Sequence, residues 1–95
     1  MAVDPDAKPD TENKMEYEEL ARYIESGKPV FVDFYAPWCG PCRTMMPMVD
    51  ELKTKYHGKI NIVKVNVDAS KKLVKEMKIQ SVPYLVLYNG GKPVY

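Results

Sequence analysis

Two cysteines, Cys39 and Cys42, are separated only by Gly40 and Pro41, and the chain has no other cysteine. At this spacing one sulfur can attack a disulfide in another molecule, and the other can resolve the mixed disulfide that results. A Cys-x-x-Cys pair beside a βαβ pattern is typical of such a redox site. Thiol–disulfide exchange is therefore the first chemistry that this sequence indicates.

A lone Cys-x-x-Cys pair is also compatible with half a metal site. Zinc sites in proteins generally use four ligands. Apart from the cysteines, the chain adds only one histidine, His57, which lies well beyond Cys42. The sequence therefore favours the redox interpretation, with no metal and no cofactor. A metal or iron–sulfur site shared by two chains through Cys39 and Cys42 is the weaker alternative.

The apolar pattern predicts how the pair is positioned. An almost continuous apolar run at residues 30–35 suits a strand that is covered on both faces. After the cysteines, apolar side chains recur at helical spacing, at Cys42, Met45, Val49, Leu52 and Tyr56. This stripe places Cys42 on the buried side of a helix and Cys39 at its exposed N-terminus. There the helix dipole stabilises a thiolate, so we expect Cys39 to attack and Cys42 to resolve.

The remaining pattern predicts one small α/β domain over residues 14–95, after a disordered tail or linker at residues 1–13. The first helix is expected at residues 14–26, capped by Asn13. The later elements follow the order strand, helix, strand and strand. They are a strand at 60–67, a helix starting at Asp68 or Ser70, a strand at 83–88, a turn at Asn89-Gly90-Gly91 and a return strand at 92–95.

Two charged residues interrupt apolar strands. Asp33 lies within the strand that leads to the cysteines, where burial raises the pKa of a carboxyl group and makes it a proton acceptor near neutral pH. It could serve Cys42 as an acid–base group, or simply reach solvent or a backbone partner. Lys64 could pair with Asp33 and modulate its ionisation, or lie near a strand end in solvent.

Composition excludes some functions. A net charge of +1 argues against a nucleic-acid binder. Acidic residues predominate at positions 1–27 and basic residues at 28–95, which indicates either a solvated surface or a mild preference for acidic partners. No run of about 18 apolar residues indicates a membrane span, and no signal peptide is apparent. A cytoplasmic protein is expected, and an excised domain of a secreted or periplasmic protein is the alternative.

Several segments together resemble the thioredoxin family, in order and in spacing, over roughly residues 17–95. They are Val32-Asp33-Phe34-Tyr35-Ala36-Pro37-Trp38-Cys39-Gly40-Pro41-Cys42-Arg43, then Pro47, Lys64-Val65-Asn66-Val67-Asp68, Val82-Pro83 and Asn89-Gly90-Gly91. The resemblance implies a thioredoxin fold, which is a central mixed sheet flanked by helices. It also implies reduction of protein disulfides, with electrons supplied by a thioredoxin reductase.

The resemblance also implies roles for individual residues. Cys39 becomes the attacking thiolate and Cys42 the resolving thiol, Asp33 the buried acid and Lys64 its neighbour. Pro83 becomes a cis-proline facing the cysteines. The substrate-binding residues become Trp38, Gly40, Pro41, Val82, Pro83 and Tyr84.

Three departures from the family pattern carry expectations of their own. Tyr84 replaces the usual Thr, no apolar strand precedes the first helix, and the sequence stops at Tyr95, before the family's last strand and C-terminal helix. An uncovered sheet face would favour self-association. The alternative function is a thioredoxin-like binding or scaffold module in which truncation has abolished turnover.

Overall fold

The computed structural model describes residues 13–94. Of the segment expected to be a tail, residues 1–12 lie outside this range. The predicted element order is confirmed. The elements are α1 (Tyr17–Glu25), β1 (Val30–Tyr35), α2 (Gly40–Lys55), β2 (Asn61–Asn66), α3 (Lys71–Met77), β3 (Tyr84–Asn89) and β4 (Lys92–Pro93). In the described part of the chain, no helix is long and apolar enough to cross a membrane.

The four strands form one mixed sheet in the order β2-β1-β3-β4. β1 pairs in parallel with β2 and antiparallel with β3, so it has a strand on both sides. A strand in this position is shielded on both edges and both faces, which explains why residues 30–35 are apolar at every position but one.

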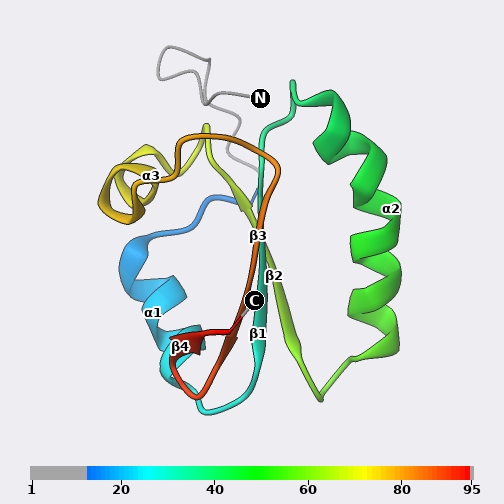
Figure 1. The fold of residues 1–95 in the computed structure, drawn as a ribbon, viewed down its shortest axis with the longest axis vertical. Helices are drawn as coiled ribbons and strands as arrows, with labels where there is room; N and C mark the ends of the chain where they lie inside the picture. Colours follow the sequence, from blue (N-terminus) through cyan, green and yellow to red (C-terminus); the bar gives the residue numbers. More distant parts are fainter. Residues whose placement is uncertain (1–12, 95) are drawn as a thin grey trace.

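Helices cover both faces of the sheet: α2 lies on one side, and α1 and α3 lie on the other (Figure 1). Tyr88 pairs with Val30 across the sheet and lines a hollow with α1, so the face that contains Val30 packs against α1 and α3. Side chains alternate along a strand, so the intervening residue Phe31 faces the α2 side. Phe31 and its partner Leu87 are half-buried. Self-association through this face stays a prediction.

The β3–β4 hairpin follows the predicted turn. Asn89 pairs with Lys92, which leaves Gly90 and Gly91 as the two central residues. Both have positive φ, at 64° and 82°, the conformation that a two-residue hairpin turn requires and that glycine adopts most readily. β4 is shorter than expected and contains only Lys92 and Pro93.

The predicted cap of the first helix is wrong. α1 begins at Tyr17, its N-cap is Glu16, and no side chain caps it. Asn13 instead adopts a φ of 56°. Its Nδ2 donates to the Tyr35 hydroxyl at 2.7 Å, and its carbonyl accepts from the Asn66 N–H at 3.1 Å. Tertiary partners at the ends of β1 and β2 thus replace the local capping interaction.

The packing of α1 can be tested through Leu20, which is 1% exposed and belongs to the main core. Leu20→Ala should lower the free energy of unfolding by about 3 kcal/mol, because it removes buried methyl groups and leaves a cavity. Urea denaturation measures this loss. Tyr23→Ala, at a position on the same helix that is 41% exposed, is the control and should cost less than about 1 kcal/mol. Equal losses in the two variants would contradict this packing.

Candidate functional site

The two cysteines lie where the central strand gives way to α2. β1 ends at Tyr35, a short turn follows, and the Cys39 N–H donates to the Ala36 carbonyl at 3.1 Å. Cys39 is the N-cap of α2, with Pro41 in the first turn, where a missing N–H removes no intrahelical bond. Cys42 is one turn into the helix.

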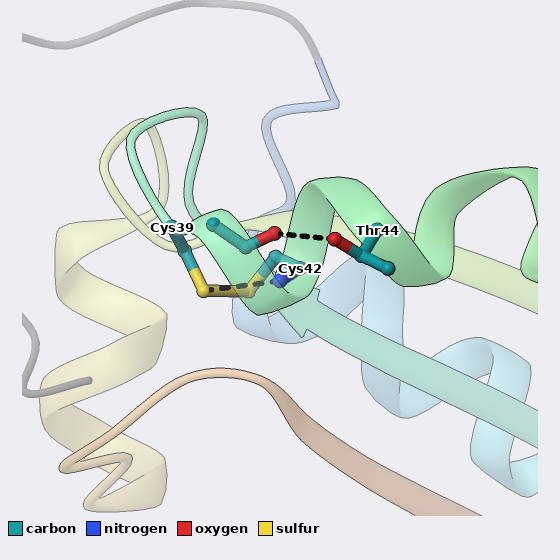
Figure 2. The surroundings of a disulfide bond; sticks show 4 residues. Cys39, Cys42 and Thr44 are labelled. Carbon is teal, nitrogen blue, oxygen red and sulfur yellow. Dashed lines mark hydrogen bonds between the residues drawn. A yellow bond between two sulfur atoms is a disulfide. The ribbon is translucent and has the colours of Figure 1, made fainter.

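Cys39 and Cys42 are joined by a disulfide (Figure 2). Their Cα atoms are 5.2 Å apart, within the range that a disulfide can span. Cys39 Sγ also accepts a hydrogen bond from the Cys42 N–H at 3.2 Å. In the same turn, Thr44 Oγ1 donates to the Gly40 carbonyl at 3.2 Å. The sulfur of Cys39 thus takes the position of a helix-capping acceptor.

That position has a chemical consequence. The first N–H groups of a helix lack intrahelical acceptors and carry partial positive charge. An N–H that already points at Cys39 Sγ would stabilise negative charge on that sulfur once the disulfide is opened. Cys42 supplies this donor from within the helix.

The expected exposure of Cys39 is wrong. Its side chain is 0% exposed, and Cys42 is 1% exposed. The reason is that the Cys39 sulfur turns back over the first turn of α2, to Cys42, and joins the main core cluster. Burial therefore does not distinguish the two sulfurs in the disulfide form. They are distinguished by position, because Cys39 is the N-cap of α2 and Cys42 lies within the helix.

Asp33 is buried in β1 on the face toward α2, with 2% of its surface exposed. Its Oδ2 has no hydrogen-bond partner among the described residues. Burial raises the pKa of Asp33 from 3.8 to about 6, with opposition from the positive charge of Lys64 and a smaller increase from Asp50. The strand thus holds a carboxyl group that changes protonation close to neutral pH.

Lys64 forms no salt bridge with Asp33, which was one of the two possibilities that the sequence left open. It lies beside Asp33 in the β1–β2 register, but its Nζ bonds Asp50 Oδ1 of α2 at 2.7 Å. Asp50 is half exposed, so this pair forms without removing a second carboxylate from water. Sequence reasoning missed Asp50, although its position next to Val49 on the apolar stripe was a usable signal.

The residues expected to bind substrate divide into buried and exposed groups. Val82 is 1% exposed and shares the core cluster with the cysteines, and Trp38 packs against that cluster. The indole Nε1 of Trp38 is buried without a hydrogen-bond partner among the described residues. Gly40 and Pro41 are exposed beside the disulfide. The sheet brings residues 82–84 to the end of β1 that leads to the cysteines.

Pro83 and Tyr84 lie at the start of β3. The Val82–Pro83 peptide bond is cis, and Pro83 is half-buried. Tyr84 is 45% exposed, and its ring centroid lies 5.7 Å from that of Phe34 in β1. The aromatic contact fixes one side of the Tyr84 ring against the sheet and leaves the other accessible.

No group of three or more His, Cys, Asp or Glu side chains in residues 13–94 could hold a metal ion.

The buried carboxyl group gives a stability prediction. Because its folded pKa of about 6 exceeds the unfolded value of 3.8, ionisation disfavours the folded state as pH rises through this window. At 1.36 kcal/mol per pKa unit, Asp33→Asn should stabilise the protein by up to about 3 kcal/mol at pH 7.5 and by almost nothing at pH 3.5. Urea denaturation at both pH values measures this difference. Glu51→Gln, an exposed control on α2, should show no such pH-dependent gain. A gain for Asp33→Asn that is equal at both pH values would contradict burial of the charge as the cause.

Known proteins resemble this chain in sequence. The thioredoxin family model covers residues 9–95. The chain is 48% identical to thioredoxin 1 of Nostoc sp. over 71 residues, which is 75% of this chain and 66% of that protein. It is also 48% identical to the chloroplastic M-type thioredoxin of Chlamydomonas reinhardtii over 69 residues, which is 73% of this chain and 49% of the relative. The matched region therefore spans less than two thirds of these relatives.

Solved structures agree with the sequence matches. Mitochondrial thioredoxin 3 of Saccharomyces cerevisiae, in its oxidised form, superposes with a TM-score of 0.75 at 32% identity, over 84% of this chain and 74% of that one. A thioredoxin of Plasmodium falciparum gives a TM-score of 0.76 at 31% identity, over 94% and 82% of the two chains. The mixed sheet, the Cys39–Cys42 disulfide at a helix N-terminus and these matches lead to one conclusion: the chain belongs to the thioredoxin family.

Proposed function

We propose that this protein reduces disulfides in other proteins through reversible oxidation of Cys39 and Cys42. The observation that carries the proposal is the position of Cys39 Sγ at the N-cap of α2, hydrogen-bonded to the Cys42 N–H and joined to the Cys42 sulfur. This is the arrangement that thiol–disulfide exchange needs: one sulfur stabilised as a thiolate and a second within bonding distance of it.

The reaction proceeds in two exchanges. In the reduced protein, the Cys39 thiolate attacks one sulfur of the substrate disulfide, and the other substrate sulfur leaves as a thiolate. Cys42, after losing its proton, then attacks Cys39 Sγ in the mixed disulfide. The second substrate sulfur leaves, so the substrate gains two electrons and the protein regains the Cys39–Cys42 disulfide.

Asp33 is the proposed acceptor of the Cys42 proton, directly or through water. Its pKa of about 6 leaves it ionised at neutral pH yet close enough to that pH to exchange protons efficiently. Lys64 acts on Asp33 only electrostatically, because its ammonium group lowers the Asp33 pKa while it pairs with Asp50.

The substrate segment is proposed to bind across the exposed surface beside the disulfide. Gly40, Pro41 and Tyr84 would contact it through exposed atoms, and Pro83 through its half-buried ring. Trp38 and Val82 would contribute their accessible edge and backbone, respectively. A Cβ added at Gly40 would meet nothing within 4 Å, which leaves open space next to the disulfide for an incoming chain.

Electrons must return to the disulfide from another protein, and a thioredoxin reductase is the proposed donor. One relative supports this: a protein of Mycobacterium leprae named bifunctional thioredoxin reductase/thioredoxin is 36% identical over 75 residues. A reducing compartment such as the cytoplasm fits a reductant. The chloroplastic relative indicates that an organelle is an alternative compartment.

Cysteine variants test the two roles in insulin reduction driven by dithiothreitol. Cys39→Ser should abolish turnover above the dithiothreitol background, because no thiolate remains at the helix end. Cys42→Ser should also lack its own resolving step. Pre-reduced Cys42→Ser, mixed with insulin after removal of dithiothreitol, should therefore accumulate a covalent adduct that is visible on a non-reducing gel. Full turnover by Cys39→Ser would refute the proposal. An inactive wild-type chain would favour the alternative, a binding module.

A pH profile tests the role of Asp33. In single-turnover reduction by pre-reduced protein, the wild-type rate of the resolving step should rise through about pH 6 as Asp33 ionises. Asp33→Asn should remove this inflection and slow the step at pH 7 by roughly tenfold or more, through loss of the proton acceptor. Rapid quenching with a thiol-blocking reagent measures the mixed disulfide over time. Glu51→Gln is the matched control and should retain the wild-type profile. An unchanged inflection in Asp33→Asn would contradict the assignment.

A further inference from the structure

One flank of α3 carries positive charge. Lys71 and Lys75 are one helical turn apart, and Lys78 is the C-cap residue of α3, while Leu73 and Val74 are buried in the core. Lys75 and Lys78 are exposed, and neither forms a salt bridge within residues 13–94.

The acidic residue of this helix does not neutralise that flank. Glu76 lines a hollow between α1, α3 and β3, together with Glu25. Lys78 instead lines a separate hollow of about 210 Å³, formed by Lys78, Ile79, Gln80, Ser81 and Tyr84. No acidic side chain lines this second hollow. Glu76 and Lys78 therefore line different hollows.

The second hollow lies next to the proposed substrate surface. Tyr84 lies opposite Phe34, near the end of β1 that leads to Cys39. The segment between α3 and β3 arches over the same end of the sheet as the start of α2 (Figure 1). Val82, which lies between Ser81 and Tyr84 in the sequence, shares the core cluster with both cysteines. A chain bound at the disulfide would thus pass close to Lys78.

The geometry points to a docking surface at Lys75, Lys78 and Tyr84 that selects protein substrates with carboxylate side chains flanking their disulfide. This inference rests on the proposed reduction of protein disulfides and names the substrate class of the same site. Unpaired ammonium groups attract carboxylates and raise the encounter rate. The exposed face of the Tyr84 ring supplies apolar contact beside them.

The test compares two synthetic peptides with the same disulfide, one flanked by Glu and one by Gln. The pre-reduced protein should reduce the Glu peptide about fourfold faster at low salt, as two exposed charge pairs would produce. The advantage should disappear at 1 M salt, where the Debye length is about 3 Å. In the double variant Lys75→Gln/Lys78→Gln, the ratio of the Glu-peptide rate to the Gln-peptide rate should fall close to one. This variant should still reduce the Gln peptide at the wild-type rate. Lys75→Arg/Lys78→Arg should retain the preference.

The matched control is Lys59→Gln, which removes one exposed charge in the turn before β2, at the opposite end of the parallel β1–β2 pair. It should keep the wild-type ratio. Reduction of both peptides at equal rates by the wild-type chain would overturn the inference and leave the proposed function intact. If the double glutamine variant slowed reduction of both peptides equally, the inference would also be overturned. Failure of the wild-type chain to reduce either peptide would overturn both proposals.

Discussion

The hydrogen bond from the Cys42 N–H to Cys39 Sγ is the interaction on which the site depends. It places one sulfur at the positive end of α2 and makes the other sulfur's own backbone the donor. The two cysteines therefore differ in environment although both are buried. Exchange chemistry needs this asymmetry, since one sulfur must carry charge while the other waits to displace the substrate.

The sheet supplies the rigidity that this hydrogen bond needs. β1 has a strand on each side and helices on both faces, so the turn that follows it starts from a fixed point. The antiparallel β3 brings Pro83 and Tyr84 to the same end as the cysteines. Residues that are distant in sequence thus lie around a single disulfide at one end of the central strands.

Asp33 shows that the fold tolerates a cost at this site. A buried carboxyl group with an unpartnered oxygen destabilises the folded state when it ionises. Lys64 could relieve the cost by direct pairing, yet it bonds Asp50 at the surface. The arrangement leaves Asp33 with a pKa near neutrality, which is useful for proton transfer and unfavourable for stability alone.

The sequence by itself determined the element order, the mixed α/β class, the hairpin at Gly90-Gly91 and the redox pair, because periodicity, turn chemistry and a two-residue spacing are local properties. It did not determine the tertiary environment of three side chains. Asn13 bonds Tyr35 instead of capping α1, Lys64 bonds Asp50, and Cys39 folds back into the core. Only the tertiary structure decided these cases, because burial and long-range hydrogen bonds depend on which elements pack together.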